Sequence, residues 1–172
     1  MEVREGVHRF AQEKTQFDCL PLGGSGSDMI YFDTAYLAKC YLDERGSEAV
    51  RALAMDAGRV ACCAFGKVEL AATIHRNLSK EKISAAKSRI IWKQFDLDES
   101  SSLWTWLEIS SEHLAEVMQQ MRELKPSVFI RAADALHLAC AREYKFKEIY
   151  SNDRHLLAAA AAFKIKGCNI IP

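Results

Sequence analysis

Long apolar runs are missing from this sequence of 172 residues. A membrane-spanning helix needs about 20 consecutive apolar residues, and no run approaches that length. The first residues mix both charge signs and show neither an apolar stretch nor a cleavage site of small residues, so we expect no secretory signal. The composition, 49% hydrophobic and 27% charged, is that of a globular protein. We therefore expect a cytoplasmic protein with no membrane partner.

The sequence also lacks a zinc-binding pattern and an excess of positive charge. Its six cysteines form no Cys-x-x-Cys or Cys/His grouping with zinc spacing, and their neighbours are apolar. We interpret them as small buried side chains in a reducing compartment. The 23 basic and 23 acidic residues cancel. Any affinity for RNA must therefore be local and partly mediated by metal.

One flexible segment divides the chain. Residues 23–27 read Gly-Gly-Ser-Gly-Ser, and Met29 then opens an apolar stretch, as a native start behind an engineered joint would. We treat 1–22 as a separate peptide, 23–28 as a Gly/Ser linker and 29–172 as one domain, which is long enough for a single core.

Within that domain, short apolar runs alternate with longer helical periods, which predicts an α/β fold with a mostly parallel sheet. The predicted strands are 30–32, 59–64, 103–109, 148–150 and 168–171. The predicted helices are 34–43, 47–57, 67–78, 79–95, 111–124, 131–144 and 154–163. We expect Ser47, Ser79 and Ser111 to cap helices, Gly58 to end one, and the 79–95 helix to bury Ile83, Ala86 and Ile90.

Four acidic residues stand out by their positions. Asp33 and Asp153 each follow a predicted strand, and ligands of open α/β sheets bind beyond the carboxyl ends of the strands. Glu69 and Asp134 lie in apolar helical stretches, where a carboxylate must be paired or bound to a metal. The simpler alternatives are helix capping for the first two and a surface position for Glu69. Because close carboxylates raise one another's pKa unless a cation neutralises them, we expect a divalent ion, Mg²⁺ or Mn²⁺.

All-carboxylate metal sites are typical of phosphodiester hydrolysis by metal-activated water. The sequence also resembles the four motifs of PIN-domain nucleases, and within them the VapC-type toxins of toxin–antitoxin pairs. The matching segments are Ile-Tyr-Phe-Asp-Thr at 30–34, Val-Glu-Leu at 68–70, Ala-Asp-Ala-Leu-His-Leu-Ala at 133–139 and Ser-Asn-Asp-Arg-His-Leu at 151–156. Together they cover essentially all of 29–172, in the right order and spacing.

The resemblance implies a three-layer α/β/α domain with a central sheet of four to five strands. It implies an endoribonuclease toxin that cuts tRNA, rRNA or mRNA, binds a cognate antitoxin and forms a homodimer through the helices of residues 34–57 and 80–95. It implies that Asp33, Glu69, Asp134 and Asp153 are the catalytic, metal-binding acids. Ala64 and Phe65 depart from the family pattern, in which a hydroxyl residue often precedes the helix of Glu69, so the cap of that helix stays open.

Several neighbouring side chains are weighed as substrate contacts. Ser151 stands where the family often has a hydroxyl near the metal, and Arg131 either contacts phosphate or pairs with one of the acids. We interpret His137 and His155 as structural. Trp104 and Trp106 alternate along a strand, which places at least one in the core. A further set of basic residues, on two helices, could meet RNA but is more simply a solvated face: Arg51, Lys80, Lys82, Lys87 and Arg89.

The separate peptide 1–22 carries five large apolar residues and two arginines, too few to fold alone but enough to dock in a groove. Our hypothesis is that it is the neutralising tail of the antitoxin, and the alternative is a plain leader. For the domain itself, one alternative is a catalytically silent PIN-like module that binds RNA or protein. A haloacid-dehalogenase-type phosphatase would need a second Asp where Ala35 stands. A receiver-like switch would need a Lys after its last strands.

Overall fold

The computed structural model describes residues 29–171, so the predicted peptide 1–22 and linker 23–28 lie outside the described residues. The strands are β1 (Met29–Tyr31), β2 (Arg59–Cys63), β3 (Trp104–Leu107), β4 (Glu148–Tyr150) and β5 (Lys166–Cys168). All pairs are parallel: β1 with β2, β2 with β3, and β4 with β5. The two ladders meet at a parallel bridge between Phe32 and Tyr150, which orders the strands β3-β2-β1-β4-β5.

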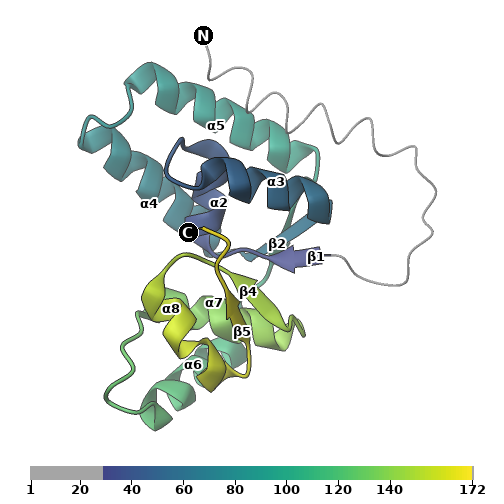
Figure 1. Cartoon of the computed structure of the whole chain (residues 1–172), viewed down its shortest axis with the longest axis vertical. Coiled ribbons are helices and arrows are strands. Elements are labelled where there is room, and N and C mark those ends of the chain that lie inside the picture. Colours follow the sequence, from purple (N-terminus) through teal and green to yellow (C-terminus); the bar gives the residue numbers. More distant parts are fainter. Residues whose placement is uncertain (1–28, 172) are drawn as a thin grey trace, which may run out of the picture.

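Helices cover both faces of these strands, as the three-layer α/β/α prediction requires. They are α2 (Thr34–Tyr41), α3 (Ser47–Ala57), α4 (Gly66–Ser79), α5 (Ala85–Ser100), α6 (Ser111–Glu123), α7 (Ala132–Glu143), α8 (Arg154–Ala159) and the 3₁₀ turn η1 (Ala160–Phe163). Figure 1 shows α2 to α5 gathered on one side of the strands and α6 to α8 on the other. The predicted α/β class with a parallel sheet is confirmed.

Strand alternation explains why there are two cores. Successive side chains of a strand point to opposite faces, so neighbours in sequence join different clusters. Tyr31 packs with α6, α7 and α8, whereas Phe32 packs with α2 to α5. In β2, Ala61 belongs to the first of these cores and Cys62 to the second. Both faces of the sheet are therefore buried, as parallel sheets require.

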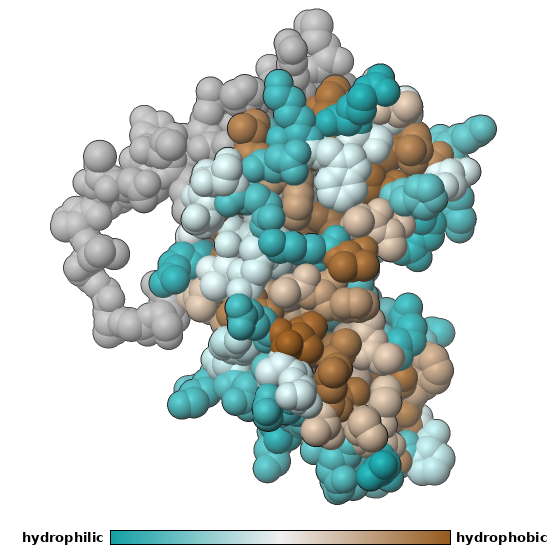
Figure 2. All heavy atoms as spheres, turned by 180° about the vertical axis from the view of Figure 1, so that it is seen from behind, coloured by the Kyte–Doolittle hydropathy of each residue, from teal (hydrophilic) through white to brown (hydrophobic). Residues whose placement is uncertain are grey.

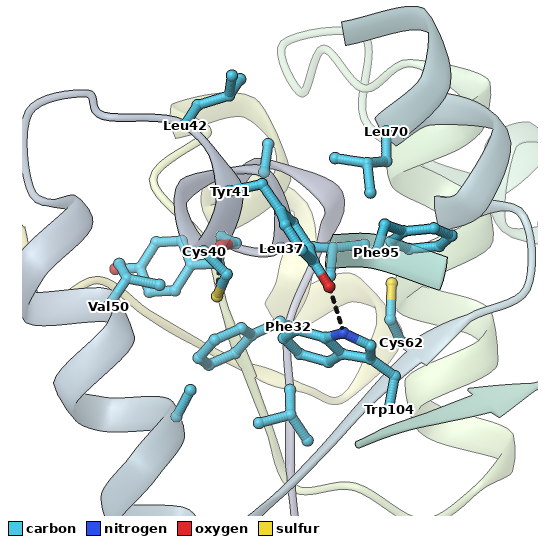
Figure 3. Close-up of a cluster of buried hydrophobic side chains, with 14 of the residues drawn as sticks. Phe32, Leu37, Cys40, Tyr41, Leu42, Val50, Cys62, Leu70, Phe95 and Trp104 are labelled. Atoms are coloured by element: carbon cyan, nitrogen blue, oxygen red, sulfur yellow. Dashed lines mark hydrogen bonds between the residues drawn. The ribbon is translucent and has the colours of Figure 1, made fainter. Parts of the chain in front are cut away.

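The core around Phe32 contains a polar chain among apolar side chains (Figure 3). Trp104 Nε1 donates to Tyr41 Oη at 2.7 Å, and Tyr41 Oη donates to Asp98 Oδ2 at 2.8 Å. The prediction that at least one of the two strand tryptophans is in the core is confirmed by Trp104, which is 5% exposed. Four of the five cysteines in the described residues are buried free thiols, as predicted, namely Cys40, Cys62, Cys63 and Cys140. The prediction is wrong for Cys168, in the short last strand β5, which is only partly buried.

Three predicted serine caps are wrong by one to five residues. The residue before α3 is Gly46, with φ +83°, and Ser47 instead bonds the loop by donating to the Leu42 carbonyl. Residue Ser79 ends α4 rather than opening a helix. Ser84 caps α5 by accepting from the Lys87 amide at 3.1 Å. Serine is a common helix-capping residue, so the local sequence does not distinguish these positions. Packing of the helix against the rest of the domain decides where it begins.

The predicted cap of α6 and the predicted position of the last strand are wrong, whereas the predicted end of α3 is confirmed. Ser110 rather than Ser111 precedes α6, and its N–H donates to His113 Nδ1 at 2.9 Å. Gly58 does end α3, with φ +69°. The last strand lies two residues earlier than predicted, at β5, because its register is set by pairing with β4.

The predicted buried face of α5 is also wrong. Because the helix begins at Ala85 and not at residue 79, its buried residues are Ser88, Ile91, Phe95 and Asp98. Ile90, predicted to face inward, is 46% exposed. Ile90 and Ile91 are adjacent and equally apolar, so the sequence alone did not show which of them faces the core.

The surface of the second half of the domain carries exposed apolar side chains. Figure 2 shows them gathered over the part of the molecule that contains α6, α7 and α8 in Figure 1. On α6 they are Leu114, Met118 and Met121. Among the described residues, no helix is both long enough and apolar enough to span a bilayer.

Candidate active site

The strand order reverses between β1 and β4, because β2 and β3 extend the sheet to one side and β4 and β5 to the other. Asp33 directly follows this point, and its N–H donates to the Tyr150 carbonyl at 3.1 Å. Its Oδ1 caps α2 by accepting from the Tyr36 amide at 3.0 Å. The other oxygen, Oδ2, accepts from Ser151 Oγ at 2.5 Å. Asp33 is thus both a helix cap and a member of the site at the switch point, where α/β proteins bind ligands.

Glu69 reaches the same place from the first turns of α4. Its Oε2 accepts from Thr34 Oγ1 and lies 2.7 Å from both Thr34 Oγ1 and His137 Nε2. The other ring nitrogen of His137 is 3.1 Å from Tyr31 Oη. Close packing of α4 on β2 makes this possible: a Cβ on Gly66 would lie 2.5 Å from Cys62 Sγ. Glycine at that position therefore lets the start of α4 approach the sheet.

Asp134 and Asp153 come from the other half of the domain and share one cation. Asp134 lies in the first turn of α7, and Asp153 caps α8 through Oδ1, which accepts from the His155 amide at 2.7 Å. The Arg131 guanidinium bonds to Asp153 Oδ2, and its Nε is 3.2 Å from Asp134 Oδ2. The latter contact lacks hydrogen-bond alignment, so Asp134 Oδ2 is buried without a hydrogen bond in the described part of the chain.

All four predicted acids line one pocket of about 520 Å³. Its walls come from α2, α4, the start of α7 and the turn before α8. One wall is a face of α4, residues 69, 72, 73, 76 and 77, continued by Lys80, the residue that follows the end of the helix. Asp33, Glu69, Asp134 and Asp153 therefore converge from four separate segments of the chain.

Burial and neighbouring charges shift the pKa values of the carboxylates in this pocket in different directions. Burial raises the pKa of Asp33 to about 6, although the charge of His137 and the Ser151 hydrogen bond oppose the shift. Burial also raises the pKa of Asp134, against the charge of Arg131. For Glu69, burial raises the pKa, but the bond to His137, its charge and the Thr34 hydroxyl outweigh it, so the pKa is lowered. Added positive charge would therefore favour the ionised forms of Asp33 and Asp134 most.

The two predicted substrate contacts differ in position. Ser151 is fully buried and bonds to Asp33, and its hydroxyl also accepts from the Asp153 amide at 2.9 Å. It can therefore act on a ligand only by holding Asp33. Arg131 lines the pocket and pairs with two of the acids. Of the two interpretations left open for Arg131, the ion pair is the one present.

Sequence reasoning missed the polar contacts of Glu69. His137 is 2% exposed and touches Glu69, Thr34 and Tyr31, so it is more than an isolated structural histidine. Its place one helical turn after Asp134 was the available signal, since residues three apart on a helix share a face. Among the basic residues of the sequence prediction, Lys80 and Lys82 line the pocket, whereas Arg51 and Lys87 pair with Asp43.

The fit of this pocket to a metal ion rests on its donor atoms. Among residues 29–171, no three acidic, histidine or cysteine side chains are gathered as closely as metal ligands are. Protein donors hold each carboxylate instead: Ser151 on Asp33, His137 on Glu69, and Arg131 on the other two. Four carboxylates are nevertheless the ligands that Mg²⁺ and Mn²⁺ prefer, and the buried Asp134 Oδ2 offers an acceptor without a hydrogen bond.

A comparison with protein families decides the fold family. The model of the PIN domain matches residues 30–162, well over half of the chain. The chain belongs to the PIN-domain family. PIN domains are generally nucleases that typically use divalent metals, so the assignment suggests a nuclease-type function and a nucleic acid substrate for this PIN domain. A comparison with curated protein sequences found no match.

Proposed function

We propose that this PIN domain is a metal-dependent endoribonuclease toxin of the VapC type, with Asp33, Glu69, Asp134 and Asp153 as its metal-binding and catalytic acids. The observation that carries the proposal is the convergence of these carboxylates on one pocket at the switch point of the sheet. Only long-range folding brings them together. Helix capping accounts for Asp33 and Asp153, but it does not account for Glu69 and Asp134, which cap no helix and still line the same pocket.

In this proposal the four acids hold the metal ion, and the residues that bond to them fix their orientation. Bound Mg²⁺ or Mn²⁺ would lower the pKa of a water molecule and neutralise charge on the phosphate. Asp33 and Asp134, whose pKa values are raised by burial, gain most from a cation. Ser151 holds Asp33 through Oδ2, and Thr34 and His137 hold Glu69 through Oε2. Such outer contacts fix the direction of metal-binding carboxylates.

A path for RNA leads away from the acids along α4. The pocket-lining face of this helix runs about 16 Å from Glu69 to Lys80, at roughly 1.5 Å per residue. Three basic side chains line its far end: Arg76, Lys80 and Lys82. Lys39, in the same pocket, is paired with Glu44 at 3.3 Å. A phosphodiester held at the acids would therefore have neighbouring phosphates within reach of positive charge.

The peptide 1–22 is proposed as an antitoxin tail that occupies this pocket. The linker that precedes Met29 spans about 12 Å on average for five Gly/Ser residues, and β1 is only three residues long before it leads to Asp33. An effective concentration near the millimolar range would hold even a weak peptide in place.

Deletion of residues 1–28 tests this proposal. We expect the shortened protein to cleave RNA faster in vitro and to be more toxic to cells than the full chain. A matched variant keeps residues 1–28 but replaces Arg4 and Arg9 with Gln, and should also gain activity if an arginine reaches the acids. Equal activity of all three proteins would contradict the antitoxin assignment and leave a plain leader.

A homodimer is also proposed, through the helices of residues 34–57 and 80–95. Exposed apolar side chains on those helices support it: Met55 is 43% exposed and Ile90 is 46% exposed. Light scattering coupled to gel filtration should give twice the monomer mass, and Ile90→Asp should reduce it. A monomer at all concentrations would contradict this part.

Cleavage of tRNA and rRNA by protein without residues 1–28 tests the proposed activity. We expect cleavage with Mg²⁺ or Mn²⁺ and none with EDTA. Asp33→Asn separates the proposal from a catalytically silent PIN-like module that only binds RNA or protein. The proposal predicts at least about 100-fold slower cleavage, because a neutral amide is a much weaker ligand for a divalent ion than a carboxylate. A silent module would show no cleavage in either protein.

A further inference from the structure

Arg131 holds two of the four acids from an exposed position. It is the residue just before α7, and its side chain is 57% exposed. Its guanidinium bonds to Asp153 Oδ2 and lies 3.2 Å from Asp134 Oδ2, so one cation bridges carboxylates from two separate elements. The planar fork of arginine suits such bridging better than a lysine would.

The same oxygens are the natural ligands of a divalent ion. Asp134 Oδ2 is buried and has no hydrogen bond within the described residues, so Arg131 neutralises its charge without satisfying it. A doubly charged ion coordinated directly would do both. Arg131 is 57% exposed, although Asp134 and Asp153 are only 14% and 21% exposed, so water can hydrate the guanidinium when an ion replaces it at the acids.

We infer that Arg131 is a built-in counter-cation that keeps Asp134 and Asp153 paired until a divalent ion takes its place. The inference rests on the proposed metal-binding function. A guanidinium and a divalent ion at the same Asp134 Oδ2 repel each other, so each weakens the binding of the other. Arg131 thus lowers the apparent affinity for the ion and sets the concentration at which the site fills.

This role differs from a fixed structural pairing. If Arg131 positioned the acids for the metal, its removal would weaken metal binding. If it competes, its removal must strengthen binding. The sign of the change therefore decides between the two, whatever its size.

Calorimetric titration of Mn²⁺ into the EDTA-stripped, dialysed full chain measures this sign. We expect Arg131→Gln to bind Mn²⁺ about 2- to 5-fold more tightly than the wild type, the range that a weak ion pair corresponds to. Arg131→Lys keeps the charge but loses the fork, so its affinity should fall between the two. The matched control is Arg142→Gln. Arg142 lies in α7, which Arg131 precedes, pairs with Glu116 at 3.0 Å, and does not line the pocket. It should leave the affinity unchanged.

The outcomes separate this inference from the proposed function. If the wild type binds Mn²⁺ and Asp33→Asn weakens binding, the metal site stands, and an unchanged or weaker affinity of Arg131→Gln overturns the counter-cation alone. If Arg142→Gln tightens binding as much as Arg131→Gln, net charge explains the effect and the inference falls. If none of the proteins binds Mn²⁺, either as the full chain or without residues 1–28, the metal site and the counter-cation are both wrong. Circular dichroism confirms that each variant is folded.

Discussion

At the scale of single residues, His137 connects the buried sheet to the edge of the pocket. Its ring lies between Tyr31 Oη and Glu69 Oε2, and the Cys63 amide in turn donates to Tyr31 Oη at 3.2 Å. Burial opposes protonation of the ring, but the neighbouring Cys63 sulfur and the Glu69 carboxylate outweigh it, so the pKa of His137 is raised. His137 and Tyr31 together therefore connect the Glu69 carboxylate to the backbone of β2.

Replacing His137 should weaken metal binding rather than unfold the domain. We predict that His137→Leu lowers Mn²⁺ affinity about 10- to 100-fold, as removal of a group that orients a metal ligand typically does. His137→Gln keeps a donor near the position of Nε2 and should lose less. The exposed His75 on the same α4 as Glu69 gives the control variant, His75→Leu. Equal affinities of His137→Leu and His75→Leu would show that Glu69 needs no support.

Asp98 predicts a pH dependence of stability that is independent of the active site. Burial raises its pKa, although the bonds from Tyr41 and Gln94 oppose the shift. A carboxyl with a raised folded-state pKa binds its proton more tightly in the folded than in the unfolded chain, so stability falls as pH rises above the ordinary value of 3.8. The Asp98→Asn variant has an amide at this position, which does not ionise, so it lacks this pH dependence.

Urea unfolding of the wild type and Asp98→Asn at several pH values checks this prediction. The free energy of unfolding of the variant, relative to the wild type, should increase between about pH 4 and pH 7. A difference that is flat across this range would mean that Asp98 is not shifted.

At the scale of elements, α4 supplies both an acid and the basic end of the pocket. We predict that Arg76→Gln combined with Lys80→Gln weakens RNA binding, measured with Ca²⁺ to prevent cleavage. The plot of log affinity against log salt should flatten by roughly 0.7 for each phosphate of a single strand that the protein no longer neutralises. Lys87→Gln combined with Arg89→Gln removes the same two charges from α5, outside the pocket, where Lys87 pairs with Asp43 at 2.9 Å. If both changes flatten the plot equally, α4 is not the path of the RNA.

Elements also show where sequence reasoning succeeds and where it fails. The strand of β4 and the stop of α3 at Gly58 were predicted correctly, because an apolar run and a left-handed glycine are local signals. The start of α5 was not, since Ser79 and Ser84 are equally good caps in sequence. The choice between them is made by which face of the helix packs against the sheet, and that is a property of the folded chain.

At the scale of the whole molecule, the α/β class and the location of the acids followed from sequence, because strand ends and apolar helix faces leave clear patterns. The neutralisation of the acids did not. Arg131 and His137 each sit one helical turn from Asp134 in sequence, but only the fold brings the first against Asp153 and the second against Glu69. The expectation that a divalent ion neutralises the cluster is therefore incomplete, since protein cations contact three of its members.

The proposed activity depends on four carboxylates acting together on RNA. The most direct measurement is the rate of Mn²⁺-dependent RNA cleavage by protein without residues 1–28, with each of Asp33, Glu69, Asp134 and Asp153 changed in turn to its amide. Glu44→Gln is the matched control, since Glu44 lines the same pocket but pairs with Lys39. We predict that the wild type and Glu44→Gln cleave while all four amide variants are slower by at least about 100-fold. Wild-type cleavage by Asp33→Asn or Asp134→Asn, or cleavage that persists in EDTA, would contradict this prediction.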